Sequence, residues 1–147
     1  MSGDLHVHFE LLEKADRVEG IARLLLRRGR LTPHMLVLCP DAGFAAQLHE
    51  RLWTVHPESF LANGIAGADA AANAMQPILL ATEILRDNSP EVLINGGLEV
   101  PPDISGFAHL VDFVDGWDES LKQMARERFR TYRQMGLDPK YLGKKTS

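Results

Sequence analysis

The residues best placed to do chemistry are four cations near the end of the chain, and the chemistry they indicate is anion binding. On a helix that advances about 100° per residue, their side chains form a stripe from about 100° to 180° around from Leu121. Like charges at i,i+4 repel by a few tenths of a kcal/mol, whereas a face that serves only solubility interleaves both signs. A solvated helix face is the alternative, but the stripe favours a bound anion. The four cations are Lys122, Arg126, Arg130 and Arg133.

An apolar spot borders this stripe. Phe129 falls at about 80° on the same projection, beside the cations, and Val114 lies at the end of the preceding predicted strand. A ring next to cationic groups suits a peptide that carries acidic residues together with an aromatic side chain or a free carboxylate end. We therefore expect an acidic-peptide site that binds partly by charge and partly through a small pocket.

Metal and thiol chemistry have weaker support. His6 and His8 project to the same face of a predicted strand, a spacing compatible with a pair of metal ligands, but no third ligand lies nearby in the sequence. Ordinary polar surface is the favoured interpretation of the pair. Cys39 ends an apolar run and is expected in the core, since nothing near it in the sequence would lower the pKa of its thiol.

Catalytic motifs are also missing. The chain has no G-x-x-x-x-G-K-[ST] run, and no G-x-G-x-x-G follows its first predicted strand. Ser59, Asp41 and His34 can be combined on paper into a triad, but none lies in a nucleophile elbow. The sequence therefore predicts a protein without catalytic residues, metal or cofactor. A small nucleotide- or phosphate-processing enzyme is the alternative.

Charge is divided unevenly along the 147 residues. Residues 1–119 hold 8 Lys/Arg and 18 Asp/Glu, a net of −10, and residues 120–147 hold 8 and 2, a net of +6, which gives the formal −4. The acidic body disfavours general nucleic-acid binding. Composition is that of a soluble globular domain, with one cysteine and no run of about 18 apolar residues. These features predict a cytoplasmic protein that neither spans a membrane nor depends on disulfides.

Short apolar runs alternate with amphipathic segments, which predicts a three-layer α/β, Rossmann-like fold with a mainly parallel sheet and a long C-terminal helix. Residues 1–136 are expected to form a single domain, and residues 137–147 a polar tail. A Gly/Ala-rich loop is expected from 63 to 76. Strands are predicted at 5–12, 35–39, 60–62, 78–82, 92–95 and 110–114, and helices at 15–28, 42–53 and 117–135.

The last helix has recognisable ends. Asp115 is placed to cap its start and Gly136 to close it, which leaves about 19 residues near Trp117 to Met135. Arg128 falls in the middle of the apolar face of this helix, at about 340° on the projection. We expect its guanidinium to pair with a carboxylate of the body.

The chain resembles one known family, most specifically in this helix. Val111-Asp-Phe-Val114 and the run from Ser120 to Arg133 strongly resemble the C-terminal signature of the chi subunit of bacterial DNA polymerase III. Leu52-Trp53, Glu58-Ser-Phe60 and Ala66-Gly67 are also similar, whereas residues 68–107 are only weakly so. The resemblance implies a non-enzymatic replication subunit of the clamp-loader assembly, with a Rossmann-like fold that lacks a nucleotide site.

In that family the C-terminal helix captures the acidic, phenylalanine-ended tail of the single-stranded-DNA-binding protein. The resemblance implies that Lys122, Arg126 and Arg130 are the cationic residues of this site and that Val114 is its apolar floor. Phe129 stands where a tyrosine is usual, which keeps the ring and loses a hydroxyl. Asp115-Gly116 replaces a single proline, which lengthens the approach to the helix by one residue.

A second surface around Phe60 and Trp53 resembles the family's docking site for the psi subunit, which links chi to the clamp loader. A core anchor of its helix is the alternative for Trp53. DNA is expected to be contacted only indirectly, because the four cations support only a modest phosphate footprint.

Overall fold

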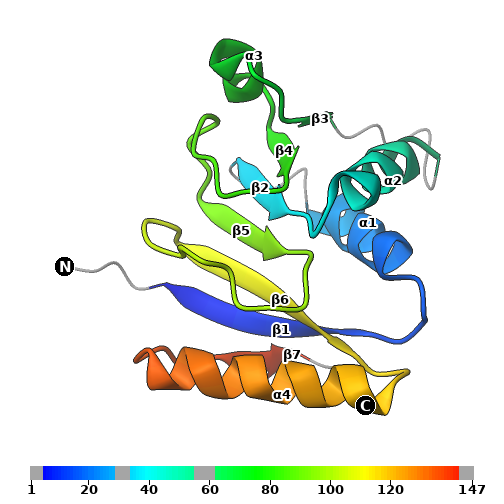
Figure 1. Ribbon diagram of the computed structural model, residues 1–147, viewed down its shortest axis with the longest axis vertical. Helices are drawn as coiled ribbons and strands as arrows, with labels where there is room; N and C mark the ends of the chain where they lie inside the picture. The colour runs from blue at the N-terminus through cyan, green and yellow to red at the C-terminus, as the bar shows by residue number, and fades with distance from the viewer. Residues whose placement is uncertain (1–4, 29–33, 55–61, 143–147) are drawn as a thin grey trace.

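The apolar runs and amphipathic segments form strands and helices that alternate along the chain (Figure 1). The computed structural model describes residues 5–28, 34–54 and 62–142. Within them the order of elements is β1 (His6–Leu12), α1 (Arg17–Arg28), β2 (Met35–Leu38), α2 (Ala42–Thr54), β3 (Asn63–Ile65), α3 (Ala70–Ala74), β4 (Ile78–Ala81), β5 (Val92–Asn95), β6 (His109–Asp115), α4 (Glu119–Gln134) and β7 (Lys140–Leu142).

The strands form one seven-stranded sheet in the order β3-β4-β2-β5-β6-β1-β7, and every pairing is parallel. All residues of β4 and β5 are buried. A parallel sheet is covered on both faces, so its central strands are buried on both sides. This explains why the sequence of these strands is a continuous apolar run and not an alternation of apolar and polar residues.

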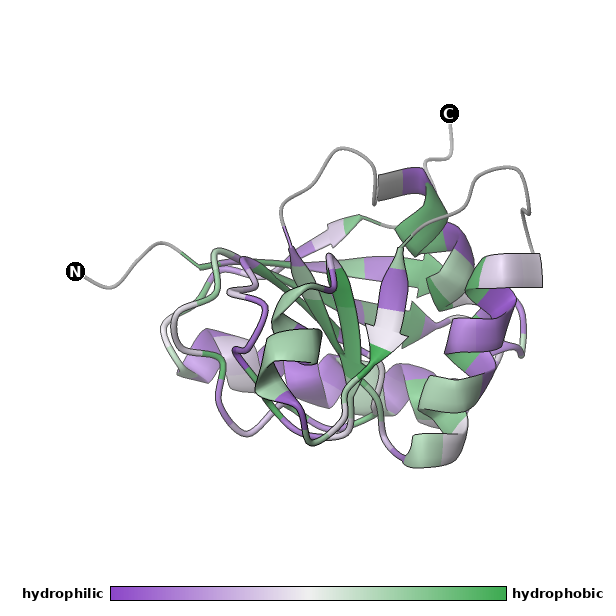
Figure 2. Ribbon diagram, turned by 90° about the horizontal axis from the view of Figure 1, so that it is seen from above, coloured by the Kyte–Doolittle hydropathy of each residue, from purple (hydrophilic) through white to green (hydrophobic). Residues whose placement is uncertain are grey.

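Helices cover both faces of this sheet, which confirms the three-layer α/β prediction. One core cluster joins Ile21 of α1 and Leu48 of α2 to Val111 and Phe113 of β6. The cluster on the opposite face joins α4 to alternate residues such as Leu110. Apolar residues are concentrated in the central strands, and hydrophilic ones lie on the helices (Figure 2). None of the helices in the described part of the chain is long and apolar enough to cross a membrane.

The middle of the chain has more structure than predicted. The strand expected at 60–62 falls partly outside the described residues, and the strand found here is β3, from 63 to 65. The loop expected from 63 to 76 also contains α3, so that prediction was wrong. The Asp69 carboxylate accepts hydrogen bonds from the amides of Ala71 and Ala72 at 3.0 and 3.4 Å. These bonds satisfy free amides at the start of a helix that has few other stabilising features.

The start of α4 differs from the prediction by one short turn. Asp118, not Asp115, is the N-cap, and its carboxylate accepts a hydrogen bond from the amide of Leu121 at 3.0 Å. Asp115 is fully buried at the end of β6, where its carboxylate binds Arg17 of α1. Since β6 extends through Asp115, α4 begins only at Glu119 and has 16 residues rather than about 19. It ends as predicted at Gly136, whose φ of +89° favours glycine.

The chain forms one more strand beyond Gly136, which was not predicted. Pro139 is buried and Leu137 packs against the core on the α4 side of the sheet. Residues 140–142, within the segment expected to be a polar tail, then pair with β1 as β7. The sheet therefore ends in a strand that lies beside α4.

Candidate acidic-peptide site

A buried ionic network fixes α4 on the sheet. The Arg128 side chain is 4% exposed, and its Nε lies 3.1 and 3.2 Å from the two carboxylate oxygens of Asp112 on β6. Its two terminal nitrogens donate to the backbone carbonyls of Leu98 and Phe113 at 2.7 and 2.8 Å. The prediction that Arg128 pairs with a carboxylate of the body is confirmed.

The buried Asp112 carboxylate accepts two further hydrogen bonds. The Tyr132 hydroxyl donates to it at 2.7 Å and the Asn95 amide at 3.2 Å. Burial, and then the neighbouring Asp112 carboxylate, raise the pKa of Tyr132 well above its usual range, so the phenol stays protonated as a donor. These bonds fix the rotation of α4 about its axis and so decide which of its side chains face outward.

A pocket of about 390 Å³ opens beside α4. Four of the residues predicted for the acidic-peptide site line it together. Its other lining residues were not predicted to belong to the site. The full lining is Phe9, Val114, Lys122, Ala125, Arg126, Phe129 and Tyr141.

The lining of this pocket combines apolar walls with positive charge. Lys122 and Arg126 lie one turn apart on α4, and the described lining contains no carboxylate. The ring centroids of Phe9 and Phe129 lie 5.3 Å apart, within the range of a favourable aromatic pair. The arrangement can bind an anion next to an apolar group.

The other two cations of the stripe lie outside the pocket lining. The Arg133 guanidinium lies 5.6 Å from the centroid of the Phe129 ring, a cation–π contact on a wall of the pocket. Arg130 is exposed one turn beyond Arg126 on the same helix. The stripe thus extends positive charge from the pocket along α4.

Local contacts neutralise this charge only weakly. The Lys122 ammonium lies 3.3 Å from a carboxylate oxygen of Glu119, a solvent-exposed pair of a kind that contributes little stability. Arg126 donates to the neutral side-chain oxygen of Gln123 at 2.9 Å. An incoming carboxylate can therefore compete for both cations.

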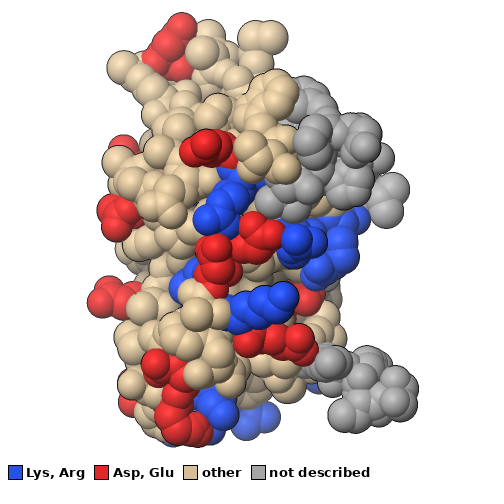
Figure 3. Space-filling view, turned by 90° about the vertical axis from the view of Figure 1, so that its right-hand side faces the viewer, with Lys and Arg blue, Asp and Glu red and all other residues tan. Residues whose placement is uncertain are grey.

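The side of the molecule that carries α1 and α2 is charged differently. Lys/Arg and Asp/Glu lie side by side on the face shown in Figure 3. On α1 and α2, Arg51 bridges Asp16 and Glu19 at 2.9 Å each, and Arg23 pairs with Glu19 at 2.8 Å. The amide of Glu19 and then the guanidinium of Arg51 lower the pKa of Asp16. Arg51 and Arg23 are thus paired with carboxylates on this side.

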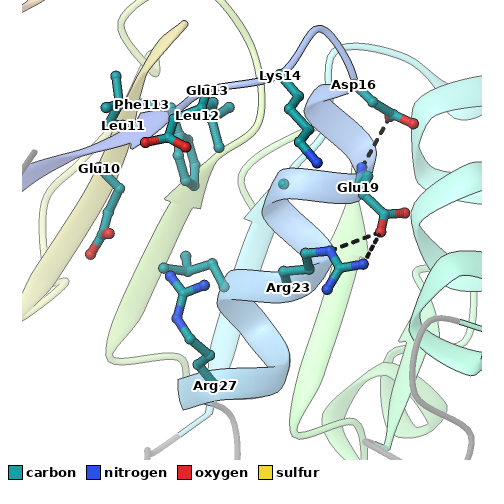
Figure 4. Close-up of a pocket in the computed structure, with 12 residues that line it drawn as sticks. Glu10, Leu11, Leu12, Glu13, Lys14, Asp16, Glu19, Arg23, Arg27 and Phe113 are labelled. Carbon is teal, nitrogen blue, oxygen red and sulfur yellow. Dashed lines mark hydrogen bonds and ion pairs between the residues drawn. The ribbon is translucent and has the colours of Figure 1, made fainter. Parts of the chain in front are cut away.

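A second pocket, of about 280 Å³, lies between β1 and α1 (Figure 4). Its rim carries Glu10, Glu13 and Glu19 as well as Lys14, Arg23 and Arg27. Because both signs are present, it is a poorer match for an acidic ligand than the pocket beside α4.

At the carboxyl ends of β5 and β6, Arg17 binds the backbone carbonyls and a carboxylate of the protein itself. In α/β folds this is where nucleotides bind. Here Arg17 donates to the carbonyls of Gly96 and Gly97 at 3.0 and 3.2 Å and also binds Asp115. A Cβ on Gly96 would lie 2.7 Å from the carbonyl oxygen of Leu38, so close backbone packing explains the glycine. This geometry argues against the alternative of a nucleotide-processing enzyme.

The two histidines pack against another histidine ring, and the cysteine is buried in the core. His6 stacks on His109 of β6 with ring centroids 5.4 Å apart, and His8 lies 6.4 Å from the same ring. No group of three or more His, Cys, Asp or Glu in the described residues could hold a metal ion. Cys39 is 1% exposed, and burial raises the pKa of its thiol to about 12, which confirms its prediction as a core residue.

Two members of the hypothetical triad, Asp41 and His34, make local hydrogen bonds instead. Asp41 caps α2 by accepting a hydrogen bond from the amide of Phe44 at 2.8 Å. The His34 ring lies 2.7 Å from the carbonyl of Asn88. Ser59 lies outside the described residues.

Trp53 lies at the end of α2, far from the candidate acidic-peptide site. It is 51% exposed, so the alternative of a core anchor is wrong; the adjacent Leu52 is buried instead. Phe60, its predicted partner in psi binding, lies outside the described residues. The helix that carries Trp53 contacts β3 and β4 at one end of the sheet, whereas α4 contacts β6 near the other end (Figure 1).

Comparison with known proteins gives consistent matches. The family model described as DNA polymerase III chi subunit, HolC, matches residues 5–140. The chain is 31% identical over 138 residues to DNA polymerase III subunit chi of Escherichia coli strain K12, which covers 88% of this chain and 92% of that protein. It is 29% identical over 133 residues to the protein of the same name from Pseudomonas aeruginosa, covering 88% and 90%.

Solved structures with the same fold come from more distant proteins. The C-terminal domain of the DEAD-box protein Dbp5 matches with a TM-score of 0.65 at 12% identity, over 97% of this chain and 91% of that domain. T4 UvsW matches with a TM-score of 0.63 at 8% identity, over 97% of this chain and 42% of UvsW. At these identities the likeness concerns the α/β fold alone.

Proposed function

The chain belongs to the DNA polymerase III chi subunit family, and on this premise we propose that it binds the acidic, phenylalanine-ended C-terminal tail of single-stranded-DNA-binding protein in the pocket beside α4. The protein acts as a cytoplasmic, non-catalytic adaptor that a psi subunit links to the clamp loader. It reaches DNA only through these partners.

One observation carries the proposal: an apolar pocket whose only described charged lining residues are the cations Lys122 and Arg126. The terminal carboxylate of the tail accepts hydrogen bonds from these two residues, and the terminal ring enters the apolar part of the pocket. Acidic residues further along the tail lie against Arg130 and Arg133. Burial of one aromatic side chain contributes about 1.5–3 kcal/mol, and hydrogen bonds between charged groups add a similar amount.

Titration of a synthetic acidic peptide that ends in phenylalanine tests this function. We expect micromolar binding that weakens as salt rises, because the Debye length falls from about 10 Å at 0.1 M to about 3 Å at 1 M. The same peptide with its terminal carboxylate amidated serves as the control and should bind more weakly. Absence of binding, or an affinity that does not change with salt, would contradict the proposal.

The distance between the two ends of the sheet supports the adaptor role. Six steps separate the edge strands β3 and β7, about 29 Å at the usual distance between strands. A partner at the Trp53 end therefore leaves the pocket beside α4 accessible. Both partners can bind one molecule at the same time.

Trp53→Ala should weaken binding of the psi subunit from the same organism about 30-fold, because exposed tryptophans are common binding hot spots worth about 2 kcal/mol or more. Affinity for the acidic peptide should stay within about twofold of wild type, since Trp53 lies at the other end of the sheet. Surface plasmon resonance with each ligand measures both effects. Unchanged psi binding, or an equal loss for both ligands, would rule out Trp53 as a psi-specific contact.

A further inference from the structure

One wall of the pocket comes from a segment that sequence patterns placed outside the domain. Tyr141 of β7 lines the pocket together with Phe9 of β1. The two residues are partners in the register of the parallel strands, so their side chains project to the same face of the sheet, toward α4. Phe129 reaches the pocket from the helix. Three aromatic rings from three separate elements thus meet at one site.

The short segment between α4 and the strand that carries Tyr141 is anchored to the body of the protein. Gly136 turns the chain at the end of α4, and Leu137 packs against the core. Pro139 is buried immediately before β7 pairs with β1. The paired strand fixes the backbone that carries Tyr141 before a ligand arrives, which lowers the entropic cost of binding.

Much of Tyr141 is also exposed to solvent and can be buried by a ligand. It is 54% exposed, although it belongs to a paired strand and lines an apolar pocket. Lys122 and Arg126 lie on the helix side of that pocket, so a carboxylate bound to them leaves the attached side chain near the rings. An aromatic side chain there would cover Tyr141 and gain ring contacts that a small side chain cannot make.

We propose that Tyr141 is a specificity-determining residue of the peptide site. It holds the terminal aromatic ring of the peptide from the β7 side while Phe129 contacts it from α4. The pocket therefore selects an aromatic residue next to a free carboxylate over a small one. This inference rests on the proposed function and adds to it the residue of β7 on which the preference for an aromatic end depends.

The test compares two acidic peptides that differ only in ending in phenylalanine or in alanine. Wild type should prefer the phenylalanine-ended peptide by more than tenfold. Tyr141→Ala should weaken binding of that peptide about five- to tenfold, the usual range for an aromatic contact with its buried area, and leave the alanine-ended peptide unchanged. Tyr141→Phe should keep the wild-type preference, because it keeps the ring.

Leu142→Ala is the matched control. Leu142 is the next residue of β7, is 47% exposed and projects to the other face of the sheet. The Leu142→Ala variant should bind both peptides with the affinity of wild type. Thermal unfolding of each variant, followed by circular dichroism, shows whether the fold is intact.

The outcomes separate the two proposals. If wild type binds neither peptide, the proposed function fails. If wild type prefers phenylalanine and Tyr141→Ala keeps that preference, the role of Tyr141 fails while the proposed function stands. Equal losses in Tyr141→Ala and Leu142→Ala would show that β7 matters only as a strand, which also overturns the role of the ring.

Discussion

Arg126→Ala is expected to weaken binding of the acidic, phenylalanine-ended peptide by about 10- to 100-fold at 0.1 M salt. Arg126 lines the pocket and donates to the neutral Gln123 side chain, so it is available to a carboxylate. A hydrogen bond between charged groups contributes about 1.5–3 kcal/mol, and each 1.4 kcal/mol changes affinity tenfold. Isothermal titration of the variant and wild type measures the loss.

Arg23→Ala is the control for this variant, because it removes the same charge from α1 on the opposite face of the sheet. Arg23 pairs with Glu19 there, and its loss should change peptide affinity by less than about twofold. The difference between the two variants should shrink at 1 M salt, as screening weakens the contribution of Arg126. Equal affinities for the two variants at low salt would exclude Arg126 as a direct contact.

Arg128→Ala is expected to lower the free energy of unfolding by about 3–5 kcal/mol, the cost of breaking a buried ion pair by removing one partner. The variant leaves the carboxylate of Asp112 buried without its cation. It also removes the donors to the carbonyls of Leu98 and Phe113. Because a domain of this size is stable by about 5–15 kcal/mol, urea denaturation should show a large shift of the midpoint.

Arg130→Ala provides the comparison on the same helix. Arg130 is exposed, and its removal should change the free energy of unfolding by no more than about 0.5 kcal/mol. Arg128→Lys should lie between the two, because an ammonium keeps the charge but lacks the planar fork that reaches three acceptors. An Arg128→Ala variant as stable as Arg130→Ala would mean that the buried network does not hold α4.

Local periodicity was sufficient to predict which side chains of α4 share a face. The positions of Lys122, Arg126 and Phe129 on one face follow from the helical repeat, whatever the helix packs against. The pairing of Arg128 was predictable as well, since a cation in the middle of an apolar face requires a carboxylate. Apolar runs located the central strands, because a parallel sheet buries them on both sides.

The start of α4 could not be predicted from the local sequence alone. Asp115 and Asp118 are both suitable caps by residue type, and only one can begin the helix. Arg17, 98 residues away in sequence, binds Asp115, which leaves Asp118 as the cap. No pattern within a short window contains that contact.

The other walls of the pocket depended on the tertiary structure in the same way. Tyr141 lies on a strand of three exposed residues, which has no alternation or apolar run to mark it. It forms a strand because β1 offers it a paired edge, and Phe9 reaches the pocket because β1 lies between β6 and β7. The sequence by itself determined a helix with a cationic stripe. Strand order decided that this stripe borders an aromatic pocket, because order depends on contacts between residues far apart in the chain.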